Sequence, residues 1–209
     1  MRGDCRREVF NWRPVAFAVV IASVLTLSGC KRQPPTDLSP LDQAGMWFSN
    51  VQELRGYNLT QAEVSELVEV RQAGLNDENC LELVRLARGR HQSFSDGDAI
   101  ASLLDAGLSS QTIMELARLN QLGPWAGEAL AMHLAKLTDA VVLDVAGRRA
   151  SGQPVLSGEK LAELRDAGYK EAQLIDLIER GTTDEQADRI LEVHNRASGR
   201  GFVRQRGRR

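Results

Sequence analysis

Apolar and polar positions between residues 60 and 195 recur with the period of helices. Three segments align on an Ala-Gly pair, at Gly74, Gly107 and Gly168. Each has apolar residues seven and four positions before the glycine, and again six, seven, nine and ten positions after it. Because residues spaced by three and four line one face of a helix, each segment predicts two amphipathic helices joined at a glycine. The chain is therefore predicted to be all-α.

The glycine corner has a physical reason. A helix commonly ends at a glycine in the left-handed conformation, which other side chains disfavour. Polar residues that can cap a second helix follow, at Asn76 or Asp77 and at Ser109. Thr60 and Glu63 have the spacing of a capping box.

The number of units follows from the glycine spacing. The interval from Gly107 to Gly168 is nearly twice the interval from Gly74 to Gly107, which leaves room for one more unit. Residues 124–146 could form it, although they lack an Ala-Gly-Leu corner. We therefore expect about three clear helical-hairpin repeats and one degenerate repeat within residues 46–195.

The repeat resembles a small helical motif of many bacterial cell-envelope proteins. The likeness rests on Ala73-Gly74-Leu75, Phe94-Ser95 and Ala106-Gly107-Leu108-Ser109. The third copy departs from the pattern with Tyr169-Lys170. The resemblance implies hairpins that sit beside other modules, and it implies no enzyme activity.

The first 29 residues have the pattern of an export signal. Four arginines and two acids precede an uncharged stretch that runs from Pro14 to Cys30. This stretch is shorter than the roughly 20 residues of a spanning helix, so a transmembrane anchor is the weaker interpretation. Its end, Leu27-Ser28-Gly29-Cys30, resembles the lipobox of bacterial lipoproteins.

The lipobox resemblance implies a lipid anchor. In that family the chain is cut before the cysteine, whose thiol carries a diacylglyceryl group, so Cys30 would join the mature chain to a membrane. Lys31 rather than an Asp follows, which in enterobacterial lipoproteins favours the outer membrane, facing the periplasm. Residues 30–45 contain three prolines and predict a lipidated tether without fixed structure.

Charge separates the end of the chain from the rest. From Cys30 to Asn195 there are 16 Lys and Arg against 26 Asp and Glu, whereas residues 196–209 hold six arginines and no acid. These arginines could bind an anionic lipid or polysaccharide: Arg196, Arg200, Arg204, Arg206, Arg208 and Arg209. A solvated disordered tail and a tail folded back on the acidic domain are the alternatives.

The chemical motifs favour structural roles. Ser157-Gly158-Glu159-Lys160 matches Ser-x-x-Lys, but without the accompanying motifs Ser157 is expected to cap a helix. Asp96-Gly97-Asp98 lacks the distal Glu of a calcium loop, so Ser95 is expected to cap a helix instead. The histidines lack zinc-site spacing. No metal or cofactor is predicted.

The sequence also predicts the surroundings of four individual side chains. Cys80 lies in an apolar stripe and is expected to be buried, the alternative being a reactive or intermolecular thiol. Glu82 and Glu115, each three residues before an arginine, predict intrahelical ion pairs with Arg85 and Arg118. Trp47 is expected to make core or helix-staple contacts, with exposure toward a partner or membrane as the alternative.

These patterns favour a binding protein over an enzyme. Nucleic acid is not an expected partner, because the second helices are acidic and the chain carries an export signal. We expect a membrane-anchored envelope lipoprotein that acts as an interaction or scaffold module for a protein partner. The alternatives are a cell-wall glycan-acting enzyme and a binder of anionic envelope polymers through the arginine-rich tail.

Overall fold

All regular structure in the part of the chain that is described is helical. The computed structural model describes residues 35–197, apart from the side chain of Pro124, and there it has eleven α-helices, one 3₁₀ helix and no strand. The helices are α1 (Ser39–Gln43), α2 (Phe48–Arg55), α3 (Gln61–Gln72), α4 (Asp77–Gly89), α5 (Gly97–Asp105), α6 (Ser110–Arg118), η1 (Gly123–Trp125), α7 (Ala126–Leu134), α8 (Asp139–Ala150), α9 (Gly158–Asp166), α10 (Glu171–Glu179) and α11 (Asp184–Ala197). The prediction of an all-α protein is confirmed.

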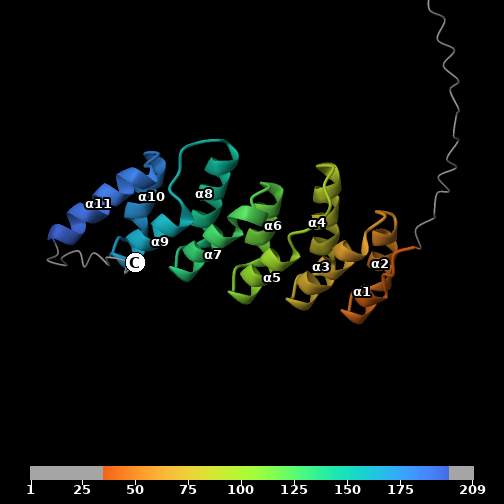
Figure 1. Cartoon of the computed structure of the whole chain (residues 1–209). Helices are drawn as coiled ribbons and strands as arrows, with labels where there is room; N and C mark the ends of the chain where they lie inside the picture. The colour runs from red at the N-terminus through yellow and green to blue at the C-terminus, as the bar shows by residue number, and fades with distance from the viewer. Residues whose placement is uncertain (1–34, 198–209) are drawn as a thin grey trace, which may run out of the picture. The chain divides into compact units, whose positions relative to one another are not determined.

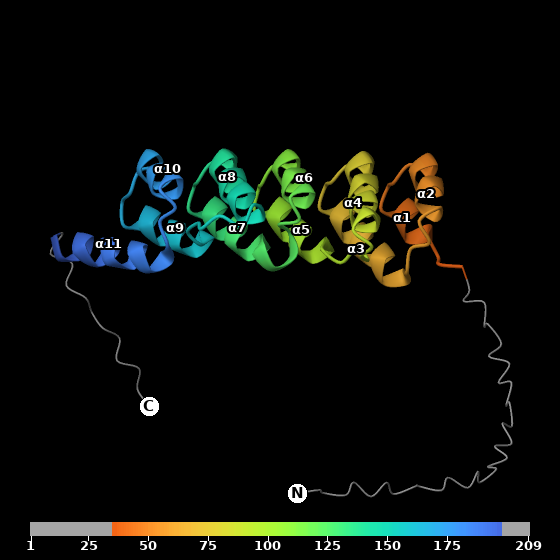
Figure 2. The same ribbon diagram turned by 90° about the horizontal axis from the view of Figure 1, so that it is seen from above.

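Consecutive helices pair into hairpins that stack side by side (Figure 1). The odd-numbered helices pack on one another from α1 to α11, and the even-numbered helices from α2 to α8 do the same. Seen from above, the two sets form two rows (Figure 2). Each internal hairpin therefore buries its apolar faces against neighbours on both sides, as in other helical repeats.

The chain turns at two kinds of corner, one between the two helices of a hairpin and one between successive hairpins. Each corner contains a residue with positive φ. Within hairpins these residues are Gly45, Gly74, Gly107, Lys136 and Gly168. Between hairpins they are Asn58, His91, Asn120, Gly152 and Gly181. Lys136, at φ 63°, stands where the other hairpins have glycine. The hairpin of α7 and α8 therefore has the same left-handed corner as the others, although it lacks the glycine.

The spacing of these corners shows where the repeat is regular. The interval from Asn58 to Gly74, around α3, equals the corresponding intervals around α5, α7 and α9. The even-numbered helices vary in length, since α4 has 13 residues and α6 has 9. Because a helical turn takes about 3.6 residues, α4 extends about one turn beyond α6. Helix α8 is long in the same way.

The first helix lies in a segment that was predicted to be a tether. For residues 39–45 that prediction, and with it a domain beginning at residue 46, is wrong. Ser39–Gln43 form α1, and the side chain of Leu41 is completely buried. Pro40 falls in the first turn of α1, where the missing N–H breaks no helical hydrogen bond. Residues 30–34 lie outside the described residues.

The boundary of the predicted basic tail also moves. Helix α11 continues to Ala197, so Arg196 belongs to the helix and forms an ion pair with Glu192 one turn earlier. The arginines from Arg200 onward lie outside the described residues, as do Cys30 and the preceding lipobox residues 27–29. Their predicted roles stay predictions.

Most predicted caps are confirmed. Thr60 and Glu63 form the capping box of α3, and the side chains of Asn76, Ser109 and Ser157 each accept a backbone N–H at the start of a helix. The predicted cap at Ser95 is wrong. Asp96 occupies the cap position of α5, and its side chain makes no capping hydrogen bond. Its carboxylate faces a pocket instead.

Candidate functional site

Buried or partly buried carboxylates join neighbouring hairpins. Glu63 in α3 is 2% exposed, accepts the backbone N–H of Phe94 over 2.9 Å and forms an ion pair with Arg88 at 2.7 Å. Burial alone would raise the pKa of Glu63, but hydrogen bonds from Arg88, Thr60 and Phe94 outweigh it and lower the pKa to about 2. Glu63 is therefore ionised at neutral pH and holds the loop between α4 and α5.

A second carboxylate contact recurs along the odd-numbered helices. Glu66 in α3 accepts the N–H of Gly97 at the start of α5 over 2.6 Å, and Glu128 in α7 accepts that of Gly158 at the start of α9 over 2.8 Å. A β-carbon on Gly97 would lie 2.8 Å from the backbone oxygen of Glu66, and one on Gly158 would lie 2.4 Å from that of Glu128. Both glycines permit a close approach that other residues would prevent.

The even-numbered helices are joined by acids in their first turn. Asp77 in α4 is buried, accepts the backbone N–H of Trp47 over 2.8 Å, and pairs with Arg71. The carboxylate of Asp139 in α8 accepts hydrogen bonds from the hydroxyl groups of Ser109 and Thr112. Burial raises the pKa of each carboxyl, but these contacts outweigh it, so the pKa is lowered. Asp77 and Asp139 therefore have a structural role, since each links its helix to a neighbouring one.

The predicted ion pairs within helices are only half correct. Arg118 does pair with Glu115, but it also reaches Glu82 in α4 at 2.8 Å. Arg85 pairs with Glu53 in α2 rather than with Glu82, so that part of the prediction is wrong. The physical reason is the stack itself, which places the preceding even-numbered helix within reach of a long arginine side chain.

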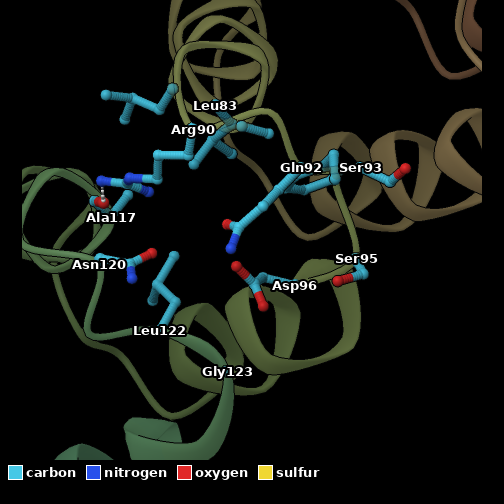
Figure 3. Close-up of a pocket in the computed structure, with 13 residues that line it drawn as sticks. Leu83, Arg90, Gln92, Ser93, Ser95, Asp96, Ala117, Asn120, Leu122 and Gly123 are labelled. Atoms are coloured by element: carbon cyan, nitrogen blue, oxygen red, sulfur yellow. Dashed lines mark hydrogen bonds between the residues drawn. The ribbon is translucent and has the colours of Figure 1, made fainter. Parts of the chain in front are cut away.

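The extra turn of α4 leaves a pocket of about 560 Å³ beside the shorter α6 (Figure 3). Its walls come from α4, the loop between α4 and α5, the end of α6 and the segment that follows α6 as far as Gly123. Its apolar residues are Leu83, Leu86, Ala87, Phe94, Ala117 and Leu122, and its polar residues include Arg90, Gln92, Asp96 and Asn120. Gln92 and Asp96 point into it. A ligand group could rest on an apolar surface and hydrogen-bond at the rim.

Two charged side chains set the electrostatics of this pocket. Arg90 donates to the carbonyl oxygens of Ala117 at 2.7 Å and Arg118 at 3.0 Å, so it bridges α4 to the C-terminal end of α6. Burial raises the pKa of Asp96, an effect that the charge of Arg90 opposes. Asp96 is thus a partly buried carboxyl group, and a hydrogen-bond donor from a ligand would stabilise its charged form.

The two tryptophans within residues 35–197 differ in exposure. Trp125 is 4% exposed and therefore lies in the core, and its indole N–H donates to Glu128 over 3.0 Å. Trp47 and Phe48, at the start of α2, are 76% and 69% exposed. The expectation that Trp47 makes core or staple contacts is therefore wrong.

Cys80 is completely buried, and burial raises the pKa of its thiol to about 12. Its predicted burial is confirmed.

In residues 35–197 no three His, Cys, Asp or Glu side chains gather as metal ligands would, and no helix is long and apolar enough to cross a membrane. Compared with protein-family models, curated proteins and solved structures, the chain matches none. Its function is inferred from its own residues.

Proposed function

We propose that this protein is a lipid-anchored envelope lipoprotein whose stacked hairpins bind a protein partner. The observation that carries the binding role is the pocket between α4 and α6, which joins apolar wall residues to the partly buried carboxyl group of Asp96. Such a combination suits one apolar side chain and one hydrogen-bond donor of a partner segment. The proposal of a lipid anchor rests on the resemblance of Leu27-Ser28-Gly29-Cys30 to a lipobox.

The surroundings of the pocket suit a binding surface. Glu63 holds the loop between α4 and α5, and Arg90 holds the end of α6, so both walls are fixed by charged hydrogen bonds. Binding residues held in this way lose little conformational entropy when a partner docks. Gln92 and Ser95 in the lining are exposed to solvent, so a segment of a partner could reach the pocket from outside.

The binding role can be tested with a photo-crosslinking amino acid at Gln92, in the pocket, and at Gln52, an exposed position on α2. In cells of the native host, Gln92 should yield one recurrent crosslinked protein that Gln52 does not. Asp96→Lys should remove that product, because it reverses the charge in the pocket. Identical products from both positions, or none from Gln92, would refute the binding role.

The anchor is tested separately. Cells grown with a palmitate analogue should label the native protein, and Cys30→Ser should abolish the label. The mature protein should begin at Cys30. Isolation of an unacylated protein that still begins at Met1 would refute the anchor and leave the pocket's role to the crosslinking result.

A further inference from the structure

The start of α2 exposes two adjacent aromatic side chains. Trp47 caps the helix and Phe48 is its first residue, and both are mostly in solvent. The other large apolar residues exposed within residues 35–197 are isolated from one another in sequence: Leu134, Ile175 and Val193. Trp47 and Phe48 therefore form a local apolar feature, which we name the aromatic tip.

The repeat shows that the fold does not need these aromatic side chains. The same two positions in the later hairpins hold polar pairs, namely Asn76-Asp77, Ser109-Ser110, Thr138-Asp139 and Lys170-Glu171. Trp47 bonds to the next hairpin only through its backbone N–H, which donates to Asp77. Any residue with an N–H could make that bond, so the indole ring is available for another contact.

The distance along the chain to the predicted anchor limits where the aromatic tip can be. The described chain begins at Pro35, five residues after Cys30, and five residues span at most about 18 Å. A lipid on Cys30 would therefore hold the first hairpin close to the bilayer surface. Trp side chains favour the membrane–water interface, where the ring is partly buried and its N–H stays hydrated.

We propose that Trp47 and Phe48 insert into the interface of the membrane that holds the lipid on Cys30. This inference rests on the proposed lipid anchor. Acyl chains retain the protein, and the aromatic tip gives the first hairpin a second point of contact with the bilayer. Two contacts limit the rotation that a single anchor permits, so the hairpins that follow leave the surface in a restricted direction.

Depth-dependent fluorescence quenching tests the insertion. Protein purified from its native membranes is reconstituted into phosphatidylcholine vesicles whose acyl chains carry bromine at defined depths. The emission of Trp47 is taken as the difference between the native protein and Trp47→Ser. We expect shallow bromines to quench most of this emission. The remaining Trp125 is buried and should be unaffected.

One control variant and two further measurements separate the possible outcomes. Leu134→Ser removes an exposed apolar residue on α7 and should leave the quenching unchanged. An acylated Cys30 with unquenched Trp47 would overturn the insertion and leave the anchor standing, whereas an unacylated Cys30 would overturn both. Self-association in detergent that Trp47→Ser abolishes, together with unquenched Trp47, would assign the aromatic tip to a second copy of the chain and likewise overturn the insertion.

Discussion

The carboxylate of Glu128 in α7 accepts a 2.8 Å hydrogen bond from the backbone N–H of Gly158, the first residue of α9. Glu66 and Gly97 make the same contact one pair of hairpins earlier. In both cases the glutamate belongs to a hairpin with a long second helix, α4 or α8. The larger repeating element of the stack is therefore a pair of hairpins, one long and one short.

Gly158→Ala should destabilise the protein by about 1–3 kcal/mol, because its β-carbon would overlap the backbone of Glu128 and force the helices apart. The matched control is Gly147→Ala inside α8, where a β-carbon meets nothing within 4 Å. That variant should be neutral or more stable by up to about 1 kcal/mol. Equal effects of the two variants in urea unfolding would contradict the close approach.

Glu63→Gln should change how stability depends on pH. The pKa of Glu63 is lowered from 4.5 to about 2 in the folded protein, so its ionised form stabilises the fold above pH 4.5. That contribution, about 3 kcal/mol, is lost as pH falls from 4.5 toward 2.

Urea unfolding at several pH values measures this effect. The substitution should lower stability at pH 7 and flatten the acid limb of the curve. The exposed Glu159→Gln should leave the curve unchanged. An acid limb that keeps its slope in Glu63→Gln would refute the role of Glu63.

The contact between Arg118 and Glu82 should contribute little to stability despite its good geometry. Their side chains are 43% and 31% exposed, and exposed ion pairs typically contribute below about 1 kcal/mol. A double-mutant cycle with Arg118→Ala and Glu82→Ala should give a coupling in that range that decreases in high salt. A larger coupling, insensitive to salt, would show that the pair is effectively desolvated.

Leu41→Ala should cost about 2–5 kcal/mol, since Leu41 is fully buried in α1. Leu134→Ala, at a position that is 60% exposed, should change stability by no more than about 0.5 kcal/mol. Hydrogen exchange would show which region responds. If residues 39–45 form no part of the fold, Leu41→Ala will behave like Leu134→Ala.

Cys80 should not react with a maleimide in the folded protein, because it is inaccessible and its pKa is raised to about 12. In denaturant the same thiol should react readily. Rapid labelling under native conditions, at a rate that denaturant does not increase, would show that the interior around α4 opens easily.

The candidate pocket was missed by sequence reasoning, and the feature that marks it can be recognised only in the structure. Its polar residues Arg90, Gln92 and Asp96 lie in the connection from α4 to α5, Asn120 lies after α6, and no motif links the two segments. This feature is the interval between the two positive-φ residues that flank each even-numbered helix. The interval is longer around α4 than around α6, so α4 extends beyond the end of α6. That feature depends on corners such as His91 and Asn120, which have no glycine and can be located only once their φ angles are known.

The sequence by itself determined the helices of the three clear repeats, most caps and the burial of Cys80, because periodicity, capping and glycine corners depend on residues within a few positions of one another. Tertiary structure alone decided that α1 folds within a proline-rich segment, that Lys136 adopts a left-handed corner, and that Arg85 pairs with Glu53. Each of these outcomes requires a neighbouring helix, and the residues that supply it lie in other parts of the chain. Local patterns cannot report which neighbour the stack will bring within reach.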